Sequence, residues 1–295
     1  MQNLFFPLAL FFIIQSNAYG NRNAFTSPSC FSMGGAGSLF SSANAQIKNP
    51  AVFNQSRSIT TSIVKYPALI SSQSLNLNFP LEDIVFSSSI KHISYGVFKG
   101  YNDYGEDIGS YRSYETWVDG YLSKTMDPYP VFLGSSVSLK SATFSSLRIK
   151  TLSTSAGAIG YFKNKNNAFG FSINQIGLKL LNHQLTYTNP NLTLGGSKKL
   201  NYLPAIIYFD FLIEKKQSIG FFMGSCITFN KNIKILVGSS TRKIDQNTSQ
   251  DLFRSMLGAT GFGFIYDSNQ ILVQYGFYYY GVGIRVDGLN IGIRF

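Results

Sequence analysis

Apolar residues alternate with small or polar ones along several segments of the chain, and this alternation limits the fold more than any other feature. Successive side chains of a β-strand point to opposite faces, so a period of two predicts strands with one apolar face. Residues 205–214 and 271–279 both show it, with many aromatic residues on the apolar face. In residues 288–295 the apolar face carries Leu289, Ile291, Ile293 and Phe295, and the other face carries Asn290, Gly292 and Arg294.

The pattern recurs from about residue 56 to the end of the chain, between short turn signals such as Asn189-Pro190 and Asp267-Ser268-Asn269. We count about fourteen candidate strands, give or take two, and an even number suits a closed antiparallel barrel. No segment beyond the first twenty residues shows a helical period. The expected strand centres are Thr61, Leu75, Ser87, Tyr95, Val118, Ser136, Gly157, Phe171, Tyr208, Met223, Leu236, Phe262, Tyr275 and Ile291.

Alternation alone fits a soluble β-sandwich, whose apolar face is the core, or an outer-membrane barrel, whose apolar face contacts lipid. Charged residues are only 13% of the chain, about half the ~25% of a typical soluble domain. Aromatic residues reach 15%, and glycines on the opposite face suit a lumen filled by other side chains. Phe295 ends the final strand, where barrel-assembly machinery recognises an aromatic residue. The sequence therefore predicts an all-β fold, a transmembrane antiparallel β-barrel in the cell outer membrane.

The first residues predict export. Residues 4–14 form an apolar run of eleven residues, too short to span a bilayer but typical of a signal-peptide core. Small residues at 16 and 18 predict cleavage after Ala18; an uncleaved anchor is the alternative, because no Lys or Arg precedes the run. We therefore divide the chain into a signal peptide (1–18), an N-terminal segment (19–55) and the barrel (56–295). The N-terminal segment is rich in Ser, Gly, Asn and Ala, which predicts a plug in the lumen or else a disordered periplasmic leader.

Two motifs in the N-terminal segment resemble a known signature. Gly34-Gly35-Ala36-Gly37 is followed by Asn49-Pro50-Ala51, in the order found at the start of FadL-like outer-membrane barrels. Glycine permits close backbone approach and positive φ, and Asn-Pro favours an extended turn into the first strand. That family usually has an Asp between the motifs, where Asn44 or Gln46 stands here.

A second resemblance lies further along the chain. Residues 95–105, followed by Gly109-Ser110-Tyr111, are similar to a Tyr-Gly, Gly-Tyr-Asp pattern of the PorV/PorQ family, and to PorQ in particular. This resemblance implies a fourteen-stranded, non-enzymatic barrel of the type IX secretion system that docks secretion or cell-surface attachment proteins. The alternative is a FadL-like channel for hydrophobic solutes such as fatty acids, although those channels are usually longer.

The sequence offers no catalytic set, no cofactor motif and no metal site. The two His and two Cys residues are scattered, whereas a metal needs clustered ligands. Ser89 or Ser94 near His92 could form a hydrolase pair, but Ser is abundant, and a histidine in a turn or at the rim is the simpler interpretation. His183 is the other histidine.

Two sets of residues could form pairs inside the barrel, one by a disulfide and the other by ion pairing. Cys30 and Cys226 could form a disulfide in an oxidising periplasm, or remain two buried thiols. Asp210 and Glu214 share the lumen face of one strand, and Arg294 is the candidate partner of these charges. The net charge of +11 suggests contact with anionic lipopolysaccharide or an acidic partner rather than nucleic acid, which an exported barrel would not meet.

Overall fold

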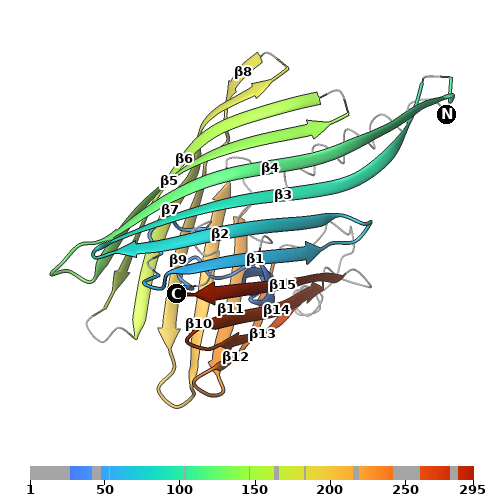
Figure 1. Ribbon diagram of the computed structural model, residues 1–295. Helices are drawn as coiled ribbons and strands as arrows, with labels where there is room; N and C mark the ends of the chain where they lie inside the picture. Colours follow the sequence, from blue (N-terminus) through green and yellow to red (C-terminus); the bar gives the residue numbers. More distant parts are fainter. Residues whose placement is uncertain are drawn as a thin grey trace.

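The computed structural model describes residues 27–41, 48–52, 54–102, 104–145, 147–162, 166–182, 184–214, 219–241, 260–279 and 285–295. The predicted signal peptide lies outside these residues. In the described residues, one short helix, α2 (Pro28–Ser32), precedes fifteen strands (Figure 1). The strands are β1 (Ser58–Lys65), β2 (Ser71–Leu81), β3 (Ile84–Tyr101), β4 (Asp107–Thr125), β5 (Val131–Phe144), β6 (Leu147–Tyr161), β7 (Asn167–Leu181), β8 (Gln184–Tyr187), β9 (Asn191–Lys199), β10 (Ala205–Glu214), β11 (Ile219–Thr228), β12 (Ile233–Ser240), β13 (Thr260–Asp267), β14 (Ile271–Tyr279) and β15 (Arg285–Arg294).

The strands close into an antiparallel barrel. Strands adjacent in sequence pair with each other, and β1 pairs with β15, so that Ile59 lies opposite Ile293. β7 pairs with β6 on one side; on the other side its first part pairs with β9 and its end pairs with the short β8. β8 therefore extends a hairpin without adding a wall strand, and fourteen strands form the barrel. The predicted fold class is confirmed.

The strand count is right although two assignments are wrong. The expected centres Ser87 and Tyr95 belong to a single strand, β3, which continues through an irregularity between Ser94 and Gly96. The sequence analysis also missed β9, because its second half, from Gly195, has no large apolar side chain to mark an alternation.

Burial in the barrel is inverted relative to a soluble protein. Along β1, Ile63 is 48% exposed while its neighbour Ser62 is 3% exposed. The outward face of the other strands likewise exposes Ile, Leu, Val, Phe and Tyr, and the inward face buries Ser, Thr, Asn and Gly. An exposed apolar band around a polar interior is the arrangement of a membrane barrel, with its outside in lipid. The protein is an outer-membrane β-barrel.

The two ends of the barrel differ. At the end where the chain terminates, strands are joined by connections of two residues (82–83) to five (126–130). At the other end, residues 241–259 connect β12 to β13. Outer-membrane barrels have short periplasmic turns and longer extracellular loops, so the C-terminal end faces the periplasm. Phe295 lies there: its N–H donates to the Arg57 carbonyl at 3.2 Å, and its ring packs edge-on against Phe79.

One side of the wall is taller than the other. β3 to β7 are 14 to 19 residues long, whereas β10 to β15 have 8 to 10. β2 pairs with β3 only up to Ser94, and β5 pairs with β4 only from Tyr114. The β3–β4 hairpin beyond these residues therefore projects above its neighbours at the extracellular end (Figure 1). Among the described residues, no helix is long and apolar enough to cross a bilayer.

Candidate functional site

The N-terminal residues 27–41 and 48–52, which we call the lumen segment, lie inside the barrel. The segment begins with α2, whose N-cap Ser27 accepts a hydrogen bond from the Cys30 N–H at 3.3 Å, and Pro28 occupies the first turn. Proline is favoured there because its missing N–H would have no partner in the helix. All five residues of α2 are buried, and Phe31 and Met33 are among the most buried apolar side chains.

Glycines on the inner face of the wall make room for this segment. A Cβ added at Gly238 of β12 would collide with the Met33 backbone, and one added at Gly134 of β5 would collide with Pro50. The segment therefore touches opposite sides of the barrel and fills the lumen at this level. The other inner-face glycines where a Cβ would come within 3.0 Å of the segment are Gly157, Gly170, Gly195, Gly224, Gly261, Gly263, Gly276 and Gly288.

The glycines of the first signature motif are required by the backbone. Gly34, Gly35 and Gly37 have φ of 65°, 93° and 123°, values that other residues rarely adopt. The chain turns here directly after α2, and a Cβ at Gly34 would also strike the Ser239 backbone of β12. Residues 34–37 thus combine a tight turn with close contact to the wall.

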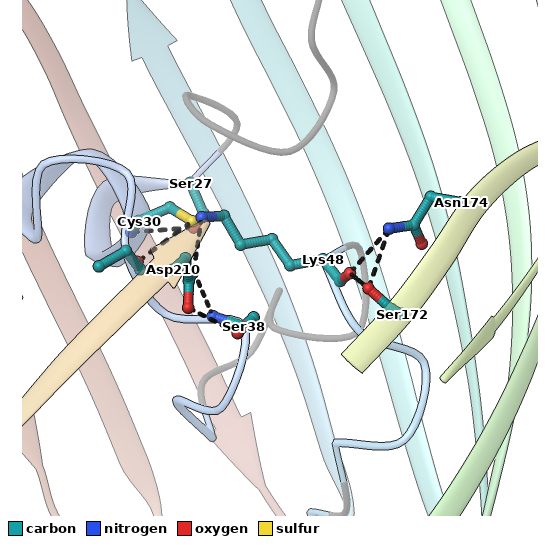
Figure 2. A network of polar contacts seen from close by, with 8 residues as sticks. Ser27, Cys30, Ser38, Lys48, Ser172, Asn174 and Asp210 are labelled. Carbon is teal, nitrogen blue, oxygen red and sulfur yellow. Dashed lines mark hydrogen bonds and ion pairs between the residues drawn. The ribbon is translucent and has the colours of Figure 1, made fainter. Parts of the chain in front are cut away.

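A buried ion pair attaches the lumen segment to β10 (Figure 2). The Lys48 ammonium lies 3.4 Å from the Asp210 carboxylate, and their side chains are 5% and 2% exposed. Ser38 donates to the same carboxylate twice, from its N–H at 2.9 Å and from its hydroxyl at 2.6 Å. Two parts of the segment therefore bind one carboxylate of the wall. We call these contacts of Asp210 with Lys48 and Ser38 the Asp210 latch.

The second signature motif is anchored to the other side of the wall. The Lys48 carbonyl accepts hydrogen bonds from Ser172 at 2.8 Å and from Asn174 at 3.2 Å, both on β7 (Figure 2). The Asn49 amide donates to the carbonyls of Ala158 and Phe171 at 3.5 and 3.4 Å, and its oxygen accepts from the Ala51 N–H at 3.0 Å. Asn49-Pro50-Ala51 is therefore fixed against β5, β6 and β7 before the chain enters β1.

Of the two possibilities for the cysteines, the structure has two buried thiols. Cys30 and Cys226 are not joined by a disulfide. Cys30 lies in α2 beside the Lys48–Asp210 pair, with its Sγ 4.0 Å from the Ala36 carbonyl (Figure 2). Cys226 lies on β11 between Ile206 and Leu236 in the sheet register. Burial raises the pKa of the Cys30 thiol, which keeps it neutral at physiological pH.

The three predicted lumen charges do not meet. Arg294 donates to Asp267 at 2.5 Å at the periplasmic rim, because it is the last residue of β15. Asp210 lies within β10 and is paired with Lys48, and Glu214 ends that strand at the extracellular side. The expected partner was therefore wrong: the sequence suggested an acidic lumen residue at Asp210 but gave no sign that Lys48 would reach it.

The histidine pair suggested by the sequence is not a catalytic arrangement. His92 lies on the outward face, where its Nδ1 is 2.9 Å from the Thr116 hydroxyl. Ser89 lies on the inward face and donates to Asp119 at 3.3 Å. His183 is outside the described residues. Within the described part of the chain, no group of His, Cys, Asp and Glu could hold a metal ion.

Solved structures with the same fold include a transporter and a channel. The toluene transporter TodX of P. putida matches with a TM-score of 0.59 and 12% identity, over 93% of this chain and 97% of its own. The monoaromatic hydrocarbon channel CymD matches at 0.57 and 11%, over 92% and 97%. A FadL homologue of Pseudomonas aeruginosa matches at 0.50 and 10%, over 91% and 97%. No family model matches the sequence, and no curated protein matches it.

These similarities define the fold. The chain shares the barrel fold of these structures, one of them a FadL homologue, over almost its whole length. Two of the three structures compared above are a transporter and a channel. The narrower resemblance to the PorV/PorQ family receives no support from them.

Proposed function

We propose that the protein is an outer-membrane channel for small apolar molecules, and that the lumen segment is its closure. The observation that carries the proposal is a barrel whose own N-terminal segment fills its lumen, in a fold shared with hydrocarbon channels. TodX is a toluene transporter and CymD is a monoaromatic hydrocarbon channel. This was the alternative interpretation of the sequence, and the fold now favours it over a secretion role.

The latch explains how such a channel stays closed. Displacing the lumen segment would break the Lys48–Asp210 ion pair and both hydrogen bonds from Ser38 to Asp210. Opening therefore requires the loss of three contacts to one carboxylate, which favours the closed state when no solute is bound. A filled lumen also blocks free diffusion of water and ions, as a channel for apolar molecules requires.

One observation favours a second candidate, a barrel that docks proteins at the cell surface. The projecting hairpin, residues 95–113, coincides with the stretch that resembles the PorV/PorQ family. It exposes apolar and aromatic side chains such as Val97, Tyr101 and Tyr104, the last of them 91% exposed. Its two strands pair only with each other beyond Ser94 and Tyr114, which leaves strand edges for a partner. Secretion-system or surface-attachment proteins and lipopolysaccharide would be its partners.

A single purification distinguishes the two candidates. The tagged protein is extracted from outer membranes in mild detergent, and bound proteins and solvent-extractable small molecules are both identified by mass spectrometry. Barrel with an apolar small molecule and no stoichiometric protein supports the channel. Recovery of a sortase-like protease, or of exported cargo with a shared C-terminal domain, overturns the channel and supports docking.

A further inference from the structure

The outward face of the barrel changes from apolar to polar within two residues on the side formed by β2 to β6, which are neighbouring strands (Figure 1). In an antiparallel sheet, residues opposite each other on neighbouring strands place their side chains on the same face. One outward row, with a single residue from each strand, consists only of exposed apolar side chains: Leu75, Ile90, Val118, Leu139 and Leu152. We call it the apolar row, and it lies against the acyl chains of membrane lipids.

The next outward row toward the extracellular end is polar on every strand. It lies two residues further along each strand, and its members in register are Gln73, His92, Thr116, Ser141 and Lys150. The row after it runs in the same way from Ser71 on β2 to Arg148 on β6. We call these two rows the outer polar band. Because the band follows the apolar row directly, it lies at the level of the lipid headgroups.

The two cations of the outer polar band lie together on β6. Arg148 and Lys150 are both exposed and outward, and their two-residue spacing corresponds to about 7 Å along the strand. The Arg148 N–H donates to the Asn182 side-chain oxygen at 3.1 Å, and the Arg148 carbonyl accepts from the Asn182 N–H at 3.3 Å. Their register partners on β5 are Ser141 and Thr143, which carry hydroxyl groups. Two cations and two hydroxyl groups therefore share a small area whose backbone is fixed.

Within the described part of the chain, no carboxylate pairs with these cations. The two rows contain neither Asp nor Glu, and neither Arg148 nor Lys150 forms an ion pair with a described residue. Glu115, which lies between the two rows on β4, is buried on the opposite face and pairs there with Lys140 at 2.8 Å. The band therefore presents two positive charges without an acidic neighbour, and such a surface attracts an anion.

The periplasmic end of the same side is built differently. Lys124 near the end of β4 is also exposed and outward, but its register partners are Ile84 and Leu133. A lysine among apolar residues can extend its stem along them and place its ammonium group in water. Lys124 thus offers one charge without a second cation or a hydroxyl group opposite it, and the paired cations distinguish the extracellular end of this side.

We propose that the outer polar band binds the phosphorylated headgroup of a glycolipid in the outer leaflet, with Arg148 and Lys150 on either side of one phosphate. A molecule seated here has its acyl chains beside the apolar row and its headgroup beside the band, which is the arrangement of a membrane lipid. Phosphate is the anion that fits, because guanidinium and ammonium groups bind its oxygens and the hydroxyl groups of β5 can donate to them. Basic clusters beside an apolar membrane surface recognise anionic headgroups in this way. The inference does not depend on the channel function, because the band lies outside the lumen.

Native mass spectrometry of the purified barrel in detergent measures the lipid directly. The barrel is titrated with lipid A, a phosphorylated disaccharide lipid, and with the same lipid after removal of its phosphates. Inorganic phosphate is added as a competitor, which separates a lipid headgroup from free phosphate as the ligand. The test variants are Arg148→Gln and Lys150→Gln, and the matched control is Lys124→Gln, which removes one outward charge at the periplasmic end. Heat-modifiable mobility on gels confirms that each variant is folded.

We expect lipid A to bind about ten-fold more weakly to Arg148→Gln and to Lys150→Gln, as for the loss of one charge-assisted hydrogen bond. Lys124→Gln should bind like the native protein, and the dephosphorylated lipid should bind weakly to all four proteins. Equal binding of the two lipids, or equal affinity of the test and control variants for lipid A, would overturn the proposal. Inorganic phosphate that displaces lipid A at the concentration of the lipid itself would show that the site takes free phosphate and would overturn the lipid assignment.

Discussion

The ammonium group of Lys48 lies 3.4 Å from the carboxylate of Asp210, although 162 positions separate these residues in the chain. This contact joins the lumen segment to the barrel wall at a place that neither strand pairing nor the signature motifs require. Both side chains are almost completely buried, so each depends on the other for compensation of its charge. The latch therefore couples the position of the lumen segment to the stability of the barrel.

Removal of the latch carboxylate should strongly destabilise the barrel. Asp210→Ala leaves Lys48 buried without its partner and also removes the acceptor of Ser38, so we expect a loss of about 3–5 kcal/mol in the free energy of unfolding. Lys48→Met should cost less, because Asp210 keeps both hydrogen bonds from Ser38. Urea unfolding followed by Trp117 fluorescence measures the difference.

The matched control for the latch is Lys234→Gln. Lys234 pairs with Asp267 at 3.5 Å near the periplasmic rim, where both side chains are partly exposed. Pairs of this kind contribute about 0–1 kcal/mol. An Asp210→Ala variant no less stable than Lys234→Gln would show that the latch does not hold the segment.

Contact between the lumen segment and the wall glycines predicts a sharp difference between two glycine substitutions. Gly238→Ala places a methyl group against the Met33 backbone, and should cost about 1–3 kcal/mol or prevent folding. Gly120→Ala adds a methyl group on the outward face of β4 with nothing within 4 Å, and should change stability by less than about 0.5 kcal/mol. The folded fraction on unheated gels reports both, and similar behaviour of the two variants would contradict the packing described above.

Cys30 should be an unreactive thiol in the folded protein. Burial raises its pKa above the ordinary value of 9.0, so the thiolate that reacts with maleimides is scarce even in mild alkali. In a Cys226→Ala background, which leaves Cys30 as the only thiol, we expect labelling at pH 8 only after unfolding. Rapid labelling of the folded barrel would mean that the lumen segment leaves its site readily.

The same burial predicts a dependence of stability on alkaline pH. Above pH 9 the unfolded chain releases the Cys30 proton while the folded chain retains it, so the free energy of unfolding falls as pH rises past that value. Cys30→Ala should lack this part of the decrease. Urea unfolding at pH 8 and pH 10 compares the two proteins, and parallel losses would show that Cys30 does not contribute.

The terminal aromatic residue predicts an assembly phenotype. We propose that the aromatic ring of Phe295, which follows β15 at the periplasmic side and packs against Phe79, is recognised during barrel assembly. Phe295→Ala should reduce the amount of folded barrel in the outer membrane several-fold, whereas Ile293→Ala, on the same outward face, should not. Quantitative blotting of unheated outer-membrane samples measures the yield, and equal yields would exclude a special role for Phe295.

Local alternation was enough to predict the barrel and the direction of most side chains. It placed Ile291 on the apolar face and Asn290 on the opposite one, and the structure exposes the first and buries the second. The alternation misled in two places. It divided β3 into two strands, although no turn separates Ser87 from Tyr95, and it missed β9, because glycines there leave too few apolar residues to alternate. One strand was counted twice and one was missed, so the total number of wall strands was still correct.

The contacts inside the lumen could not be predicted in the same way. The glycine-rich inner face suggested a filled lumen, but the partner of Asp210 is a lysine from a segment without regular structure. Arg294 was the expected partner because it shares the inner face, yet strand register places it at the rim beside Asp267. Lys91 and Lys140 likewise follow no local pattern, because they meet at the Trp117 ring only through the pairing of β3, β4 and β5.

Uptake of labelled toluene by cells that carry the protein in their outer membrane, and that lack hydrocarbon channels of their own, tests the central claim most directly. Native protein should raise the initial rate several-fold over cells without it, and Asp210→Asn, which keeps the side-chain shape but weakens the latch, should raise it further. Lys124→Gln, which is remote from the latch, should match the native protein. If correctly assembled barrel leaves the rate at that of cells without the protein, this is not a channel for small apolar molecules.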